Sequence, residues 1–495
     1  MQRVFRVLAL AIGYSILVAS SLATLASAAR YAQIRWFYAP AAPEHLAEKE
    51  SYLAALPAVD PAAAPNFVVI FFDDLGFGDL SSYGNRLIRT PHIDRAAAEG
   101  LKMTDFYSAS PVCTPSRAAL LTGRFPPRTL TDRHVFFPEN SMLGILRRMV
   151  GWANELPRDE ITVAEVLGRA GYATGMIGKW HLGGRAGHRP NDFGFQSWLG
   201  VLWSNDMAPL DLYRDGEVLQ EDRRDFFLIG ERDEASPLGP GGIDQGTLTG
   251  TYTDEAIAFL ETNRERPFFL YVAHTFPHVP HYPSREGAGQ SDGGTYGDVV
   301  EDLDRSTGTI LAALDRLGLA ENTVVFITSD NGADYNGSPG ALRGRKGDIL
   351  EGGQRVPMIV RWPGRVPAGA VSAEPAMNTD LFPTLLSLAG LPLPADREID
   401  GRDISALLEG RAGSPHDQLF FFPVTESLPG AVRSGRFKYL LSTGDNGRNR
   451  AHLSRLDADA EAHELSNLYP DEAKRLDVTL QAMRERIEEN PRGWR

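Results

Sequence analysis

The sequence has 495 residues, 43% of them hydrophobic and 23% charged, which excludes a disordered chain and predicts one large domain with a smaller one. Its single cysteine excludes an intramolecular disulfide and a thiolate-rich zinc or iron–sulfur site. The net charge of -14 argues against nucleic acid as a partner, although a local basic pocket could still bind a small anion.

The N-terminus has the order of segments found in an export signal. Arg3 and Arg6 precede an apolar stretch over residues 7–25, and an Ala-Ser-Ala sequence over 26–28 offers a cleavage site. Residues 1–28 are therefore predicted to be a signal peptide, or a retained signal anchor that tethers the protein to a membrane. Either way the protein is expected to be exported, and to be periplasmic or secreted. The Ala/Pro-rich residues 29–65 are predicted to form a tether with one short helix.

Four apolar runs in the sequence end at polar residues. Their composition suits strands that are buried on both faces of a parallel sheet. They are Phe67 to Phe72 before Asp73 and Asp74, Tyr172 to Gly178 before Lys179 and His181, Phe268 to Ala273 before His274 and His278, and Thr323 to Ser329 before Asp330 and Asn331. Because ligands bind beyond the carboxyl ends of such strands, the four polar groups are predicted to form one site.

Helical patterns lie between these strands. Pro115 suits the first turn of a helix, which would place Cys113 at the N-terminus of that helix. Thr162 and Glu165 form a capping-box signature, and residues 298–317 have apolar side chains at helical spacing. Strands that alternate with helices predict an α/β fold with a large mixed, mainly parallel sheet sandwiched by helices.

The pattern changes towards the C-terminus. Residues 380–389 are predicted to be the last helix of a large domain over 66–395. Residues 433–441 alternate like one antiparallel strand, and residues 471–486 have the pattern of a terminal helix. A smaller α+β domain with an antiparallel sheet is therefore predicted over 396–495.

The residues after the first and last of the four strands suit a metal ion. Asp73, Asp74, Asp330 and Asn331 supply three carboxylates and one amide, all hard oxygen ligands of the kind that Ca²⁺ and Mg²⁺ prefer. Taken alone, each pair is more often a turn or a helix cap. Adjacent carboxylates at the end of a buried strand, however, repel each other unless a cation neutralises them.

The lone cysteine begins the run CTPSRAALLTGR. A single cysteine is usually a small buried hydrophobe, but one at a helix N-terminus could be an activated nucleophile. This run resembles the signature of the type I sulfatases, in which the cysteine of C-x-P-S-R is oxidised after translation to formylglycine. Other segments agree in content and order over residues 66–440, namely FFDDLGFGDLSSYG, GKWHLGG, WSNDM, PHVP, TSDNG and GRKGDILEGG.

The resemblance implies an alkaline-phosphatase-like fold, a catalytic domain over 66–395 and a set of residue roles. A Ca²⁺ ion, with Mg²⁺ as the alternative, would be held by Asp73, Asp74, Asp330 and Asn331 and would also contact the formylglycine made from Cys113. Arg117 would orient the hydrated aldehyde, and His181 would act on its second hydroxyl. Lys179, Ser204, His278 and Lys346 would bind the sulfate, with Lys346 or His278 near the leaving oxygen. His274 and His281 lie near His278, which is chosen for its PHVP context.

The implied reaction is hydrolysis of a sulfate monoester to sulfate and an alcohol or phenol. One hydroxyl of the aldehyde hydrate attacks sulfur and the alcohol leaves; deprotonation of the other hydroxyl then expels sulfate. Catalysis of this kind needs cations aimed at the sulfate oxygens, which Arg117, Lys179 and Lys346 could supply. The resemblance also implies a formylglycine-generating maturation enzyme as a partner.

Two other functions share most of this pattern. A formylglycine-dependent phosphonate monoester or phosphodiester hydrolase would use a similar site, because sulfate and phosphate esters share shape and charge. The second is an inactive sulfate-ester-binding protein that kept the fold. The sequence disfavours it, because every expected polar position is filled. The WSNDM segment makes the chain similar to arylsulfatase-type members, while the loops over 125–160, 205–245 and 282–297 leave aryl, carbohydrate and lipid sulfates open as substrates.

Overall fold

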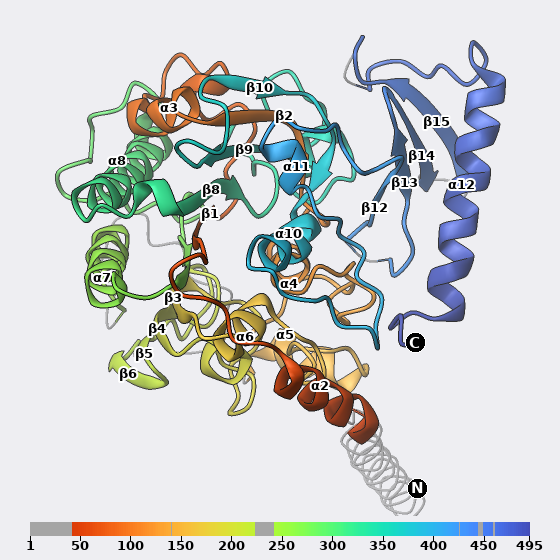
Figure 1. Ribbon diagram of the computed structural model, residues 1–495. Helices are drawn as coiled ribbons and strands as arrows, with labels where there is room; N and C mark the ends of the chain where they lie inside the picture. Colours follow the sequence, from red (N-terminus) through yellow and green to blue (C-terminus); the bar gives the residue numbers. More distant parts are fainter. Residues whose placement is uncertain (1–41, 140, 223–241, 425, 444–448, 459–460) are drawn as a thin grey trace, which may run out of the picture.

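The computed structural model describes residues 42–495 apart from 140, 223–241, 425, 444–448 and 459–460 (Figure 1). The predicted signal segment over 1–28 lies outside the described residues. Within the part of the chain that the structure describes, no helix combines the length and the apolar composition needed to cross a membrane.

An eleven-stranded sheet forms the centre of the larger unit. Its strands are Asn66–Phe72 (β1), Leu101–Tyr107 (β2), Ala173–Lys179 (β3), Ser197–Val201 (β4), Leu212–Arg214 (β5), Glu217–Gln220 (β6), Phe268–Ala273 (β7), Thr323–Ser329 (β8), Arg355–Arg361 (β9), Ala370–Ser372 (β10) and Ala376–Met377 (β11). They lie in the order β10-β2-β9-β8-β1-β7-β3-β4-β5-β6, with β11 beside β2. The central pairs around β1, β3 and β7 are parallel, whereas β9 runs antiparallel to both neighbours. The predicted mixed, mainly parallel sheet is confirmed.

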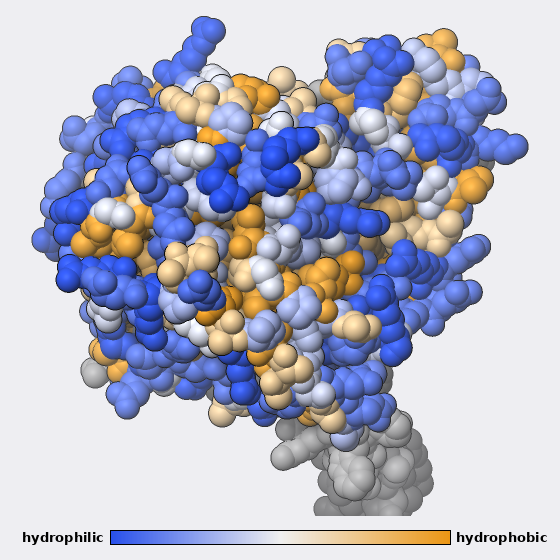
Figure 2. Space-filling model, viewed as in Figure 1, coloured by the Kyte–Doolittle hydropathy of each residue, from blue (hydrophilic) through white to orange (hydrophobic). Residues whose placement is uncertain are grey.

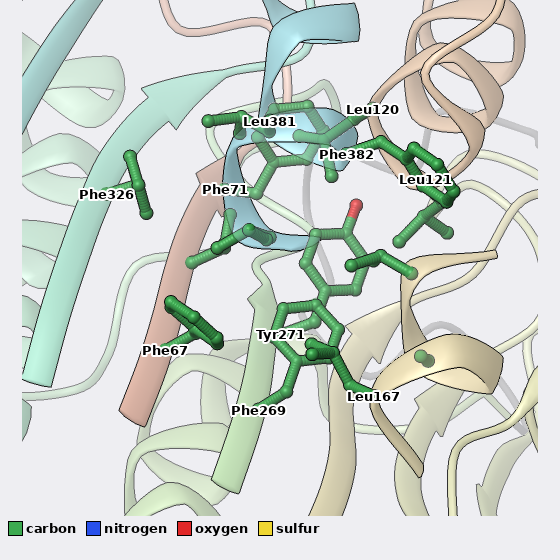
Figure 3. Packing of buried hydrophobic residues seen from close by; sticks show 14 of the residues in the cluster. Phe67, Phe71, Leu120, Leu121, Leu167, Phe269, Tyr271, Phe326, Leu381 and Phe382 are labelled. Carbon is green, nitrogen blue, oxygen red and sulfur yellow. The ribbon is translucent and has the colours of Figure 1, made fainter. Parts of the chain in front are cut away.

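Helices cover both faces of this sheet. The described helices of this unit are Pro43–Ala55 (α2), Pro91–Ala98 (α3), Cys113–Thr122 (α4), Met142–Met149 (α5), Val163–Arg169 (α6), Leu248–Asn263 (α7), Gly294–Arg316 (α8), Glu351–Gln354 (α9), Leu381–Leu388 (α10) and Ser405–Leu408 (α11). Alternate side chains of β1 enter two separate cores. Phe67 and Phe71 pack with α4, α6 and α10 (Figure 3), and Val68 and Ile70 pack with α3, α7 and α8.

The start of α6 has the predicted cap. Thr162 Oγ1 accepts a hydrogen bond from the N–H of Glu165 (3.2 Å), and the Glu165 carboxylate accepts one from the N–H of Thr162 (3.0 Å). The other carboxylate oxygen of Glu165 lies 2.6 Å from Lys49 Nζ of α2, and Leu53 of α2 is buried in the core. The described part of the predicted tether therefore forms a helix that is packed on the domain.

The C-terminal unit is an antiparallel sheet covered by one long helix. Its strands are Leu419–Phe421 (β12), Ala431–Ser434 (β13), Phe437–Thr443 (β14) and Asn449–Arg455 (β15), and the helix is Pro470–Glu489 (α12) (Figure 1). The prediction of one strand over 433–441 is wrong. The chain reverses at Gly435, whose φ of 54° is a conformation that favours glycine, so these residues belong to the neighbouring strands β13 and β14.

A buried charge network joins the two units. Lys438 of β14 lies between Glu351 of α9 and Glu461, with N–O distances of 2.9 and 3.0 Å, and none of the three side chains is exposed. Burial would raise the pKa of Glu351, but Lys438 and nearby arginines hold it at about 2. Because α9 follows directly after the loop that carries Lys346, the C-terminal sheet helps to fix the position of that loop.

Replacement of Lys438 by methionine is expected to lower the free energy of unfolding by about 3 to 5 kcal/mol, because it removes the buried cation that Glu351 and Glu461 share. Denaturant titration would measure the change. The matched control is Lys474→Met, at an exposed position on α12, which should change the free energy by less than about 0.5 kcal/mol. Equal effects of the two substitutions would contradict the role given to this network.

Candidate active site

Two neighbouring strands bring the predicted oxygen ligands together. β1 and β8 pair in parallel with Phe72 opposite Ser329, so the residues after both strands lie side by side. The N–H of Asp74 donates to Asp330 Oδ1 (3.0 Å), and Asn331 Nδ2 donates to Asp74 Oδ1 (2.7 Å). These residues and Asp73 are all buried. The backbone of Asp74 has a φ of 64°, an uncommon conformation that Asp tolerates better than most residues.

Cys113 reaches this cluster from α4. The helix begins at Cys113, as the position of Pro115 predicts, and Cys113 Sγ lies 3.4 Å from Asp73 Oδ1 and 4.0 Å from Asp74 Oδ1. Burial raises the pKa of the Cys113 thiol well above its ordinary value. The unmodified side chain is therefore a neutral thiol, which is a weak nucleophile.

Each of the three carboxylates lies against a cationic side chain. The pairs are Arg117 with Asp330 (2.8 Å), Lys179 with Asp73 (2.5 Å) and Lys346 with Asp74 (2.7 Å). The first two cations are fully buried, whereas Lys346 keeps 23% of its side chain exposed and so faces the solvent side of the cluster. With all six groups ionised the cluster has no net charge. A divalent cation bound there would make it attractive to an anion.

The buried acids fit a hard metal ion. Burial and the neighbouring Asp73 raise the pKa of Asp330 to about 7, against the influence of Arg117. Burial also opposes ionisation of Asp73, but Lys179 and other cations hold its pKa well below the ordinary value. Asn331 Oδ1 is buried and has no hydrogen-bond partner among the described residues, which is costly unless something else binds it. Carboxylate oxygens and a free amide oxygen are ligands that Ca²⁺ and Mg²⁺ accept.

The geometry adds a histidine to this group. One ligand atom from each of Asp73, Asp74, Cys113 and His278 lies within 4.8 Å of all the others. Asp330 does not belong to this set; its Oδ2 accepts from Arg117 and its Oδ1 accepts from the Asp74 N–H. This buried group could therefore bind a metal ion, and its donor atoms do not identify which one.

Lys179, the last residue of β3, lies beside Ser204, which follows β4. Lys179 Nζ donates to Ser204 Oγ at 3.0 Å, and both side chains are buried. Arg117 Nη1 donates to the Lys179 carbonyl (2.9 Å), which ties α4 to the end of β3. The structure thus brings the predicted sulfate-binding pair next to the carboxylate cluster.

His181 is held as a neutral base. Its Nε2 lies 3.0 Å from the Phe136 carbonyl, which can only accept, so Nε2 carries the proton and Nδ1 carries the lone pair. Nδ1 is buried and has no hydrogen-bond partner in the described part of the chain. Burial, helped by Lys179, lowers the pKa of His181 well below its ordinary value. The φ of 59° at this residue is strained, as is common where a side chain is held for a function.

Of the three histidines after β7, His278 faces the cluster, with Nε2 3.6 Å from Asp74 Oδ2. His274 is buried beside Ser306, and burial lowers its pKa to about 3. His281 packs edge-on against Tyr296, with ring centres 5.3 Å apart. The choice of His278 from its sequence context therefore agrees with the geometry.

Sequence reasoning missed Asn205, which orients His278. Asn205 Oδ1 and the Val279 carbonyl both lie within hydrogen-bond distance of His278 Nδ1, at 3.0 and 2.6 Å. Both are acceptors, so Nδ1 carries a proton and donates it, and Nε2 is directed at Asp74. The signal was present, because Asn205 follows Ser204 in the WSNDM segment.

Comparison with known proteins gives two matching family models. One is described as Sulfatase and matches residues 65–391; the other is described as N-sulphoglucosamine sulphohydrolase, C-terminal, and matches residues 346–492. Steryl-sulfatase of Mus musculus is 40% identical over 74% of this chain and 69% of its own length. N-acetylgalactosamine-6-sulfatase of Canis lupus familiaris is 40% identical over 78% of this chain and 73% of its own length. Arylsulfatase A of Homo sapiens is 39% identical over 85% of this chain and 82% of its own length.

Solved structures agree in fold. PsFucS1 sulfatase from Pseudoalteromonas sp. superimposes with a TM-score of 0.73 at 25% identity, covering 91% of this chain and 96% of that one. Phosphonate Monoester Hydrolase of Agrobacterium radiobacter superimposes with a TM-score of 0.59 at 20% identity, covering 85% and 96%, and shares the fold alone.

Proposed function

This chain belongs to the sulfatase family, and we propose that it hydrolyses sulfate monoesters with a formylglycine made from Cys113 and a Ca²⁺ ion. Asp73, Asp74, Asp330 and Asn331 would hold the ion. The observation that carries the proposal is the position of Cys113, at a helix N-terminus and within 4.0 Å of two carboxylates that are each paired with a lysine.

The residues of the chain would bind and orient the sulfate group. Lys179, Ser204 and Lys346 supply donors beside Cys113, and donors fixed before the reaction stabilise charge that develops on sulfate oxygens. Arg117 is held by Asp330 and the Lys179 carbonyl, so it would keep the side chain at position 113 in one orientation. Lys346, the exposed cation of the three, would meet the ester as it enters.

Proton transfers would complete the turnover. A hydrated formylglycine would supply two hydroxyls on one carbon: one would attack sulfur and lose its proton to a neighbouring carboxylate of the cluster, and deprotonation of the other would release sulfate. His181, neutral and unpartnered at Nδ1 within the described residues, would accept a proton there. Lys346 would protonate the leaving oxygen, and His278, whose Nε2 is directed at Asp74, would lie near it. The bound cation would neutralise the carboxylates and attract the anionic ester.

The alternative of a phosphonate monoester or phosphodiester hydrolase is not favoured. The curated relatives at about 40% identity are named sulfatases, whereas the phosphonate hydrolase is similar in fold alone. We expect purified enzyme to have a kcat/KM for 4-nitrophenyl sulfate at least roughly 10²-fold above that for bis(4-nitrophenyl) phosphate and for a 4-nitrophenyl phosphonate. The reverse order would contradict the proposal, and no turnover of any ester would support the inactive binding protein instead.

Export, by a cleaved signal or a retained membrane anchor, is proposed from the pattern of residues 1–28. Exposure of the chain to a formylglycine-generating enzyme is proposed with it, since the mechanism requires oxidation of Cys113.

A further inference from the structure

Similarity to known sulfatases does not identify the alcohol that the enzyme would release from its substrate. Relatives named for a sterol, for an amino sugar and for aryl sulfates are 40%, 40% and 39% identical to this chain. The leaving group must therefore be inferred from the side chains that surround Cys113.

One side of Cys113 is apolar. Cys113 packs in a buried cluster with Val112 and Val135, and three partly buried side chains lie against that cluster: Phe137, Met207 and Val424. We call these three residues the apolar wall. They come from three separate segments: Phe137 follows α4, Met207 follows β4, and Val424 lies in the connection between β12 and β13. Convergence of three segments on the reactive residue is what a substrate-binding surface requires.

The polar and apolar groups around Cys113 suit the two ends of an amphiphilic ester. The cations and Ser204 would engage the sulfate, so the organic group would contact side chains that adjoin Cys113 and still keep exposed surface. The side chains of the apolar wall pack against the cluster that contains Cys113 and are only partly buried, so they suit this role. An apolar alcohol would gain about 25 cal/mol for each Å² that it buries there. A sugar would lose water from hydroxyls that Phe, Met and Val cannot bind.

The wall is fixed in place by backbone hydrogen bonds. Asn154 pairs with both backbone groups of Phe137, accepting from its N–H (2.9 Å) and donating to its carbonyl (2.7 Å). The N–H of His134 donates to the Val424 carbonyl (3.0 Å), which joins two of the three segments. The His134 ring also stacks on Phe137, at an interplanar angle of 11°. A wall held this way is preorganised for one kind of ligand.

Exposed apolar side chains also lie on and after α5, close to Phe137 in the sequence. Asn154, which holds Phe137, lies just after α5, and the side chains on and after that helix are unusually exposed for their type. They are Met142 (57%), Ile145 (42%), Leu146 (45%), Met149 (46%), Val150 (53%) and Trp152 (43%). In the view of Figure 1, hydrophilic side chains cover much of the surface, with smaller apolar areas between them (Figure 2).

We propose that the substrates are sulfate esters of apolar alcohols or phenols, and that Phe137, Met207 and Val424 select them over sulfated sugars. The inference rests on the proposed sulfatase function and adds the class of leaving group to it.

A series of 4-alkylphenyl sulfates, from methyl to hexyl, tests the proposal, because the chemistry at the ester stays constant while the apolar group grows. Enzyme whose formylglycine has been verified by mass spectrometry should show kcat/KM rising up to about threefold per added CH₂. Phe137→Ser and Met207→Ser should flatten this dependence. The matched control, Leu87→Ser, removes an exposed leucine outside the wall and should keep the dependence.

A second comparison uses two primary-alcohol esters, hexyl sulfate and N-acetylgalactosamine 6-sulfate. We expect the hexyl ester to be preferred. A flat alkyl series, or preference for the sugar ester, would overturn the apolar leaving group while the sulfatase function stood. Failure to release sulfate from every ester tested would contradict the proposed function itself.

Discussion

Replacement of Cys113 by alanine is expected to lower kcat by roughly 10⁴-fold or more, since loss of a covalent nucleophile commonly costs that much. The reason lies in the cluster: the cations and carboxylates would still bind a sulfate ester, but nothing would attack sulfur. Sulfate release measured at saturating 4-nitrophenyl sulfate checks this, with thermal unfolding to show that the variant is folded.

Cys113→Ser separates the formylglycine mechanism from a simple nucleophile. Serine offers one hydroxyl where the hydrated aldehyde offers two, so the variant should release at most about one equivalent of 4-nitrophenol per site and then stop. Mass spectrometry of the peptide around Cys113 provides the control on the unsubstituted enzyme, where the aldehyde or its hydrate should replace the thiol. Full activity with an intact thiol would rule out the mechanism.

Removal of the metal ion is expected to lower kcat/KM by roughly 10² to 10³-fold, similar to the loss of a strong electrostatic contact to the reacting group. Three buried carboxylates would then lack their divalent counter-ion. Independently of activity, Ca²⁺ at about a hundred times its Kd should add about 2.7 kcal/mol to the free energy of unfolding and raise the Tm. Chelation followed by addition of Ca²⁺ or Mg²⁺ would measure both effects and compare the two ions.

The matched pair for this test is Asp330→Asn and Asp334→Asn. Asp330 belongs to the buried cluster, whereas Asp334 lies nearby in the same loop, where its carboxylate accepts from the N–H of Asn336 (2.7 Å). Only the first substitution should reduce the Ca²⁺-dependent rise in Tm. Full activity and an unchanged Tm in metal-free enzyme would refute the metal site.

The arrangement at the strand ends could be predicted because it follows from local rules. The apolar run over Phe67 to Phe72 identifies a buried strand, and parallel pairing places Asp73 beside Asp330 without knowledge of any loop. Pro115 likewise indicates where α4 begins, and so where Cys113 lies.

The remaining features depend on tertiary contacts that no local pattern encodes. The tautomer of His278 is set by Asn205, 73 residues away in sequence, and that of His181 by the carbonyl of Phe136. The strand error at Gly435 has a different cause: residues 433–436 are Arg-Ser-Gly-Arg, and the prediction of one strand passed over the turn that Ser434 and Gly435 indicate. The apolar wall escaped prediction because Val424 comes from the C-terminal unit.

That contribution of Val424 and the buried ion pair between Lys438 and Glu351 have a shared consequence for engineering the protein. The C-terminal unit carries none of the proposed catalytic residues, yet it helps to hold the loop of Lys346 and contributes Val424 to the apolar wall. Grafting this unit from another sulfatase would therefore transfer a substrate preference, and it would succeed only if the charges at 351 and 438 were exchanged as a pair.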